Sequence, residues 1–419
     1  MKRVLSLACL SLLLGCDDSD GVTPRYWYPL PECPDHQLEP CDTLATECQD
    51  RLLSLAACMY DVDAIPRVPI QVVTEEELVE QLDAIAAGDD DEGDAPDADL
   101  AYAEQTLIQL QLAKRGDLTG EETTANLVER LEGVYIDPEH GILIVDRGSP
   151  RKSTDANAVL LHELVHALQD ARYELDDFRS RLPATEDATL AGRTVVEGQA
   201  TYLHFRALLA MNGRDVERFD WARSLDLYRD EILGVAYEDP SPFLVSGVTF
   251  PYAYGVQLAY DAWRSDGPRF HTKQFAKPPV TTLELIEVDA STADVLDADA
   301  FSTPEGTLDA GLAAIHDTSL GAFLLDLHLR AGGGAAGAAA ELSRAWRGDR
   351  LFIYADESDE AAWLWELAFE TSSDARAFAD RDFAAGVSAG RNGSRVFLAG
   401  AADGAPDVLV TAGEAFIDQ

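Results

Sequence analysis

Residues 159–170 read V-L-L-H-E-L-V-H-A-L-Q-D and place two histidines and a glutamate at a spacing that can bind a metal ion. Residues four apart lie on one face of an α-helix, so His162 and His166 can direct both imidazoles at one Zn²⁺. Glu163 lies between them and is rotated so that its carboxylate reaches a water on the metal rather than the metal itself. The alternative is a surface helix on which two histidines are four residues apart by chance.

The side chains around this motif are uncharged and mostly apolar, which is typical of a helix that is buried on nearly all sides. Burying two histidines and a glutamate without partners is costly, and a shared metal ion removes that cost. We therefore expect a third ligand from another part of the chain.

A second helical stretch, residues 186–211, contains T-V-V-E-G-Q-A-T-Y at positions 194–202. Together with H-E-L-V-H-A-L-Q it resembles the gluzincins, HExxH metallopeptidases whose third zinc ligand is a glutamate on the next helix. More narrowly, it is similar to a group of secreted bacterial and archaeal zincin-like proteins. The resemblance implies that Glu197 is the third ligand; His204, two turns further on, is the rival, and a solvated glutamate is the plain alternative. Glu186 and Asp187 are candidates to accept the free N–H of a zinc-bound histidine.

Residues 250–255, F-P-Y-A-Y-G, are expected at the start of a helix and resemble the same group. Many zincins place a tyrosine or histidine opposite the catalytic glutamate, where it donates a hydrogen bond to the oxyanion. The resemblance implies Tyr252 for this role, with Tyr254 second; an aromatic packing cluster is the alternative. Later stretches such as K-P-P-V-T-T and W-R-G-D-R-L-F-I-Y extend the resemblance loosely over residues 134–398.

The activity that this resemblance implies is hydrolysis of peptide bonds in a peptide or protein substrate. His162, His166 and Glu197 would hold Zn²⁺, and Glu163 would take a proton from the zinc-activated water and give it to the leaving amine. A lipid-anchored, non-catalytic binding or assembly protein on a zincin scaffold is the alternative from a different class. A globular lipoprotein that needs no metal is the third.

The N-terminus has the pattern of a targeting segment. Lys2 and Arg3 precede a short apolar run that is too short to span a bilayer, which predicts a signal peptide. The run ends in L-L-G-C, which looks like the lipobox of bacterial lipoproteins and implies cleavage before Cys16 and lipid on its sulfur. We expect a cell-envelope protein that is attached to a membrane through this lipid; an ordinary cleaved signal is the alternative.

Four further cysteines, Cys33, Cys41, Cys48 and Cys58, lie within one short segment. An even number in an exported chain predicts two disulfides, for which three pairings are possible, and a zinc knuckle is the rival. The chain has 76 acidic and 32 basic residues, a formal charge of −44. This balance argues against nucleic acid or an anionic membrane surface as a partner, since both attract lysine and arginine.

The expected fold class is α+β and helix-rich, with a zincin-like domain that combines a small sheet and the HExxH helix. We expect a signal peptide at 1–15, a tether at 16–30, a disulfide-stapled helical module at 31–65, and a helix with an acidic loop at 66–99. The zincin-like domain follows at 100–303 and an α+β region at 304–419. Residues 134–136 and 142–145 flank a turn sequence and predict a β-hairpin. The resemblance implies that residues 142–146 form a sheet edge for an extended peptide.

In the last region we expect helices at 306–330 and 335–346, strands at 351–354 and 362–369, and a helix at 372–379. A hairpin of residues 395–398 with 408–410 is expected to close it. The sequence R-G-D at 347–349 is expected to form a turn.

Overall fold

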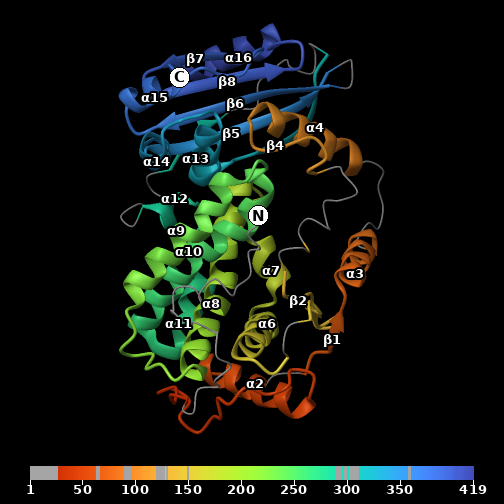
Figure 1. The fold of residues 1–419 in the computed structure, drawn as a ribbon. Helices are drawn as coiled ribbons and strands as arrows, with labels where there is room; N and C mark the ends of the chain where they lie inside the picture. Colours follow the sequence, from red (N-terminus) through yellow and green to blue (C-terminus); the bar gives the residue numbers. More distant parts are fainter. Residues whose placement is uncertain are drawn as a thin grey trace.

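The computed structural model describes residues 27–62, 67–88, 96–118, 128, 131–148, 151–287, 295–296, 300–301, 311–356 and 360–419. The chain is a mixed α+β protein in which helices predominate (Figure 1), so the expected class is confirmed. Residues 1–26, with the expected signal peptide and Cys16, lie outside the described residues. So does most of the acidic loop expected within residues 66–99.

Long helices form the lower part of the molecule in Figure 1. The two central ones, α6 (Thr154–Tyr173) and α8 (Glu186–Met211), carry the H-E-x-x-H and V-E-G-Q-A sequences. They are joined through α7 (Leu175–Ser180), and further helices pack around them: α9 (Trp221–Glu238), α10 (Pro242–Asp266), η3 (Gly267–Arg269), α11 (Phe270–Ala276) and α12 (Leu283–Ile286).

Side-chain caps begin both central helices at defined residues. Ser153 accepts a hydrogen bond from the Ala156 backbone at the start of α6, and Thr185 accepts one from Ala188 at the start of α8. Each cap satisfies a backbone N–H that the first turn leaves free. The bounds expected for α8 are confirmed. The sequence F-P-Y, however, lies in the middle of α10 and not at a helix start, because α10 begins at Pro242, a proline in the first helical turn.

A three-stranded sheet lies beside α6, with strand order β1-β3-β2. The expected hairpin is confirmed: β2 (Gly133–Tyr135) pairs antiparallel with β3 (Ile142–Val145). The expectation that residues 142–146 form a sheet edge is wrong, because β1 (Ile70–Val73) pairs parallel with β3 on its other side. Among the described strands, β3 is therefore central and β2 is the edge next to α6.

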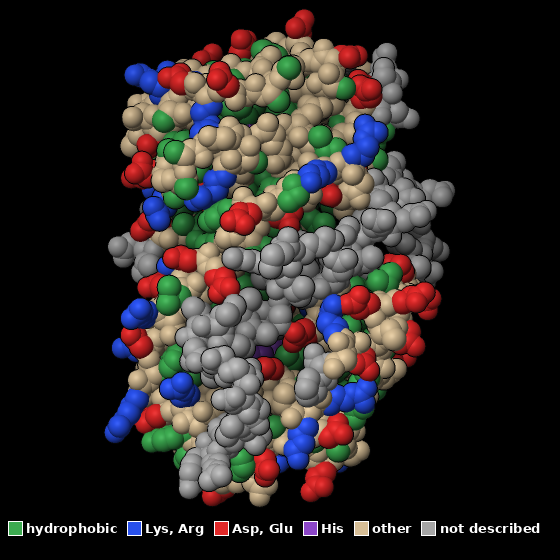
Figure 2. Space-filling view, viewed as in Figure 1, with side chains coloured by type: hydrophobic (Ala, Val, Ile, Leu, Met, Phe, Trp, Pro, Cys, Tyr) green, Lys and Arg blue, Asp and Glu red, His purple; other side chains and the backbone are tan. Residues whose placement is uncertain are grey.

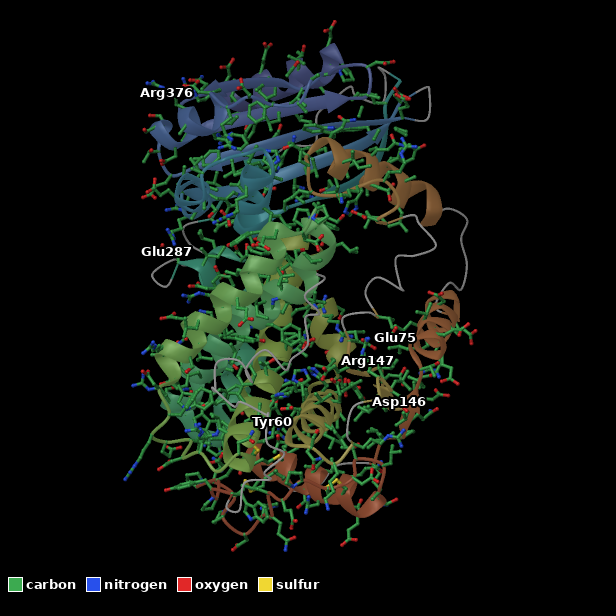
Figure 3. All side chains as sticks on the ribbon, viewed as in Figure 1. Tyr60, Glu75, Asp146, Arg147, Glu287 and Arg376 are labelled. Atoms are coloured by element: carbon green, nitrogen blue, oxygen red, sulfur yellow. A yellow bond between two sulfur atoms is a disulfide. The ribbon has the colours of Figure 1, made fainter. Side chains whose placement is uncertain are left out.

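A capping box and an ion pair position α3 (Glu75–Gly88) next to this sheet. The Thr74 backbone donates to Glu77, and the Glu77 backbone donates to the Thr74 hydroxyl, as in a capping box. Arg147, which follows β3, forms an ion pair with Glu75, and the two are labelled side by side in Figure 3.

The C-terminal region contains an antiparallel five-stranded sheet with strand order β4-β5-β6-β8-β7. Its strands are β4 (Ala313–Thr318), β5 (Trp346–Ala355), β6 (Ala361–Phe369), β7 (Ser388–Asn392) and β8 (Arg395–Ala401), and its helices are α13 (Gly321–Ala331), α14 (Ala336–Arg344), α15 (Ser372–Ala379) and α16 (Asp407–Ile417). The expected strands at 351–354 and 362–369 and the helix at 372–379 are confirmed.

Three expectations for this region are wrong. Residues 313–318 form an edge strand of the sheet rather than part of a helix. Residues 408–410 lie in α16, whose Leu409, Gly413 and Phe416 are buried at helical spacing. R-G-D lies inside β5, and its Asp349 is buried and accepts hydrogen bonds from Ser319 Oγ, the backbone of Leu320 and Gly321, and the indoles of Trp346 and Trp365.

Alternate side chains of this sheet belong to two different apolar clusters. Phe352, Leu364 and Phe397 pack with α16 on one face, whereas Trp363 and Trp365 belong to the main core on the other. The second face is covered in part by α4 (Pro96–Gln109), which comes from the N-terminal half of the chain (Figure 1). Gln105 accepts a hydrogen bond from the Ala361 backbone, and Gln109 accepts one from the Trp363 indole.

The segment before β1 contains α2 (Thr46–Met59) and two disulfides, Cys33–Cys58 and Cys41–Cys48. It packs against the ends of α6 and α8. Asn157 of α6 exchanges hydrogen bonds with the Cys41 backbone. Arg206 of α8 pairs with Glu32 at 2.8 Å, and both side chains are buried. The stapled segment is therefore attached directly to the two helices of the H-E-x-x-H and V-E-G-Q-A sequences.

Asp187 joins the start of α8 to the C-terminal region. It is buried and accepts hydrogen bonds from the backbone and hydroxyl of Thr282, while its own backbone donates to Ser319. Burial raises the pKa of Asp187 to about 7, although the hydrogen bonds from Thr282 act in the opposite direction; the nearby charge of Asp349 raises it further.

This junction predicts a pH dependence of stability. An unfolded aspartate has a pKa of about 3.9, so between that value and about 7 the folded chain holds a proton at Asp187 that the unfolded chain releases. The stabilisation is therefore present at low pH and is lost as pH rises through the folded pKa. Asp187→Asn should lose less unfolding free energy than the parent between about pH 5 and about pH 8 in urea titrations. Asp176→Asn, on the surface of α7, is the control; an Asp187→Asn curve parallel to the parent's would contradict the assignment.

Candidate metal centre

Three side chains from α6 and α8 converge on one point. His162 Nε2 lies 3.0 Å from His166 Nε2. Glu197 Oε2 lies 3.5 Å from His162 Nε2 and 3.4 Å from His166 Nε2. The two histidines come from one face of α6, and the glutamate faces them from α8, as the helical spacing and the resemblance implied. In the described part of the chain these residues form a group that can hold a metal ion.

The spacing of these three atoms fits a zinc ion. Zinc binds imidazole nitrogen and carboxylate oxygen at about 2.0–2.2 Å, and tetrahedral geometry then places ligand atoms about 3.3–3.6 Å apart. The observed separations lie within a few tenths of an ångström of that range. Glu197 Oε2 is buried, and the two imidazole nitrogens face it at 3.5 and 3.4 Å. A cation is therefore a natural partner for this oxygen.

The charges in the group are mutually dependent. Burial acts to lower the pKa of His166, but the charge of Glu197 and a hydrogen bond to it raise that pKa to about 9. Burial acts to raise the pKa of Glu197, but the two imidazoles hold it well below its ordinary value. The carboxylate is thus kept ionised, the form in which it can bind a metal ion.

Glu163 lies beside the three ligands without joining them. It is buried, and its Oε2 accepts a hydrogen bond of 2.8 Å from the Tyr135 backbone. Tyr135 belongs to β2, and this N–H points away from β3. A Cβ on Gly133 would lie 3.3 Å from Glu163 Cγ, so strand and carboxylate are in close contact. The edge strand of the small sheet therefore holds the glutamate of the H-E-x-x-H motif.

Tyr252 of α10 lies against the same group. Its ring stacks on His162 with centroids 6.0 Å apart. Burial raises the pKa of Tyr252 well above its ordinary value, and the negative charges of Glu197 and Glu163 raise it further. The phenol is thus held protonated, as a hydrogen-bond donor. Tyr254 lines a different cavity of about 680 Å³, together with Arg330 and Asp326.

A close approach of α8 and α10 brings Tyr252 to this place. A Cβ on Gly198 would overlap the backbone of Gly255, and a Cβ on Gly255 would lie 2.5 Å from the Thr194 carbonyl. Gly198 directly follows Glu197, and Gly255 is one helical turn after Tyr252. The glycines of V-E-G-Q-A and F-P-Y-A-Y-G therefore let the two helices touch beside the metal ligands.

The structure separates the other candidates from this group. His204 is buried, with its ring centroid 6.0 Å from that of His162, but it is not part of the metal-binding group. Glu186 and Asp187 lie in the first turn of α8, three turns before Glu197, and Asp187 bonds to Thr282. The expectation that they support a ligand histidine is wrong, because at the rise of an α-helix they lie roughly 15 Å from Glu197 along the axis of α8.

Sequence reasoning missed the residue that does contact a ligand histidine. Gln169 Oε1 lies 2.8 Å from His166 Nδ1. The residue stands three positions after His166 on the same helix, where side chains of neighbouring turns meet. That spacing was the available signal.

The group is nearly but not fully buried. The Glu197 side chain is 15% exposed and the His162 side chain 1%. In Figure 2 a histidine side chain lies in a hollow near the middle of the face, with acidic side chains beside it.

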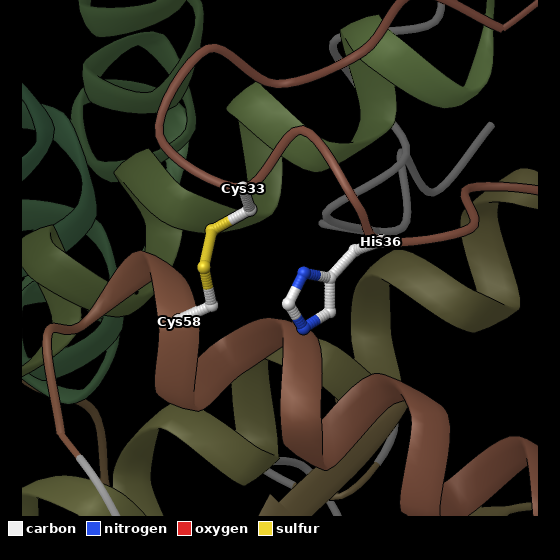
Figure 4. A group of neighbouring side chains, drawn as sticks. All are labelled: Cys33, His36 and Cys58. Carbon is white, nitrogen blue, oxygen red and sulfur yellow. A yellow bond between two sulfur atoms is a disulfide. The ribbon is translucent and has the colours of Figure 1, made fainter.

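Cys33, His36 and Cys58 form a second close group, but its two sulfurs are bonded to each other (Figure 4). The zinc knuckle considered for these cysteines is therefore not formed.

A family model described as a domain of unknown function (DUF8575) matches residues 306–411. The match covers the five-stranded sheet and the first part of α16, and it leaves α6, α8 and the metal-binding group outside. No curated protein and no solved structure matches this chain. Among the described residues, no helix is both long enough and apolar enough to cross a bilayer.

Proposed function

We propose that this protein is a zinc metallopeptidase of the zincin-like type, attached to a membrane of the cell envelope through lipid on Cys16. The observation that carries the enzymatic part is the convergence of His162, His166 and Glu197 with ligand-atom separations of 3.0–3.5 Å. Two imidazoles and one carboxylate are a common donor set of catalytic zinc sites, which keep a fourth position for water or substrate.

When bound, zinc would activate a water molecule and polarise a carbonyl. Glu163, which accepts a hydrogen bond from the Tyr135 backbone, would accept the proton from that water and pass it to the leaving amine. Tyr252, which is held protonated with its ring against His162, would donate a hydrogen bond to the carbonyl oxygen as negative charge develops.

The position of β2 supports a peptide as the substrate. Among the described strands β2 has a neighbour on one side only, and its outer edge faces Glu163. An extended peptide can pair with such an edge through backbone hydrogen bonds, which bring its carbonyls past the glutamate. Gly133 at this edge lets the strand lie close to Glu163, because a Cβ there would be 3.3 Å from Glu163 Cγ.

Metal removal tests the proposal. The purified chain should contain one zinc ion, and gelatin zymography should show a band that is lost with a chelator and regained with added zinc. His166→Ala should lose the zinc and the band, whereas His140→Ala, an exposed histidine outside the group, should keep both. Zinc binding without any hydrolysis would replace this proposal with a binding or assembly role. A purified chain that binds no zinc would rule out both the peptidase and a zinc-dependent binding or assembly role.

A further inference from the structure

The two ligand histidines are held in different ways. His166 has its Nδ1 only 2.8 Å from Gln169 Oε1, and both side chains are buried. The Nδ1 of His162 is also buried but has no hydrogen-bond partner in the described part of the chain. Only one of the two imidazoles is thus fixed at its second nitrogen by a protein side chain.

Backbone geometry decides which end of the Gln169 amide faces His166. The other end lies 3.0 Å from the Val196 carbonyl oxygen, which can only accept a hydrogen bond. That end must therefore be the NH₂ group, and the oxygen must face His166. An amide oxygen is only an acceptor, so the proton of this contact belongs to His166 Nδ1.

Further amides continue this arrangement away from the metal-binding group. Gln199 Oε1 accepts from Gln169 at 3.2 Å and from the Tyr60 hydroxyl at 2.7 Å. The Gln199 NH₂ donates at 2.7 Å to Gln274, whose own NH₂ donates at 3.0 Å to the Leu258 carbonyl. The backbone carbonyls of Val196 and Leu258 accept from the first and last glutamine of this row. Each of the three amide groups can therefore adopt only one of its two orientations. Tyr60 (Figure 3) adds a contact from the end of α2 in the stapled segment.

We propose that Gln169 is a positioning residue for the metal centre: its oxygen holds His166 in the tautomer that carries the proton on Nδ1. When zinc is bound, the lone pair of Nε2 would then be free to bind the ion that Glu197 also holds. This inference rests on the metal centre of the proposed function. Gln199, Gln274 and Tyr60 act through Gln169, by keeping its amide from turning over.

Zinc affinity tests the proposal without reference to hydrolysis. In competition with a chromophoric chelator, Gln169→Leu should bind zinc about 10–100-fold more weakly than the parent. Gln199→Leu, which removes one of the two acceptors of the Gln169 NH₂, should show a smaller loss in the same direction. Gln257→Leu on the surface of α10, whose amide bonds to Asp261, is the matched control and should bind like the parent.

A second measurement needs no variant and so does not depend on how Gln169→Leu folds. In the zinc-loaded parent labelled with ¹⁵N-histidine, His166 should show a protonated Nδ1 and a metal-bound Nε2. The reverse assignment, or a Gln169→Leu affinity within about twofold of the parent in a folded protein, would overturn the proposal. A parent that binds zinc and cleaves no peptide would instead refute only the proposed function, because both readouts concern the bound metal.

Discussion

Glu163→Gln should retain its zinc and lose peptide hydrolysis by about 10²–10⁴-fold, the usual contribution of a positioned general base. The amide keeps an oxygen that can accept from the Tyr135 backbone, so the fold around β2 should be preserved. It cannot take a proton from water. Zinc content should be unchanged because Glu163 is not one of the three residues in the metal-binding group.

The measurements are zinc per chain and the rate of casein cleavage. Glu139→Gln, on the exposed turn of the hairpin, makes the same chemical change outside the site and should cleave at the parent's rate. A Glu163→Gln variant that cleaves casein as fast as the parent would show that the base lies elsewhere. A variant that loses both zinc and cleavage would assign Glu163 to the metal ligands.

Gly198→Ala should destabilise the fold by at least about 1–3 kcal/mol and weaken the metal centre at the same time. A methyl group on Gly198 would overlap backbone atoms of Gly255, and backbone cannot move aside as a flexible side chain does. The helices α8 and α10 would have to separate. Since Glu197 and Tyr252 lie next to this contact, both would leave their present positions.

Gly234→Ala gives the matched control, because it is a helical glycine in α9 with nothing within 4 Å of an added Cβ. Alanine is favoured over glycine inside a helix by about 0.5–1 kcal/mol, so this variant should be more stable than the parent. Guanidinium titration should then show changes of opposite sign for the two substitutions, and zinc competition should show weaker binding for Gly198→Ala alone. Equal stabilisation by both would mean that α8 and α10 are not in contact at Gly198.

Local signals in the sequence predicted the elements that hold the candidate site. The uncharged run around His162 and His166 predicts a buried helix. The expected bounds of α8 coincide with the structure, where Thr185 caps the helix and two acidic residues lie in its first turn. The helical spacing of four places the histidines together. Glu197 was reached through a resemblance rather than through spacing, since a ligand on another helix depends on tertiary packing.

The expectations that proved wrong depended on contacts between residues that are far apart in the sequence. β3 is central only because β1, some seventy positions earlier, pairs with it. Residues 408–410, V-L-V, have strand propensity, yet Leu409 and Phe416 are buried against the sheet from a helix, so packing decided the outcome. The Gln169, Gln199 and Gln274 row joins three helices. Gln169 could have been found from its spacing to His166, but no local pattern distinguishes Gln199 and Gln274 from glutamines on a helix surface.

Helix α4 has a consequence for the order in which the chain can fold. Gln109 and its partner Trp363 are separated by 254 positions, so α4 is synthesised long before the sheet strand that it contacts. Closing so long a loop is slow, and apolar surface stays exposed until it closes. The sheet within the matched residues 306–411 is therefore covered in part by α4, which lies outside the matched residues. During synthesis, α4 cannot contact β6 until the chain has been made as far as Trp363.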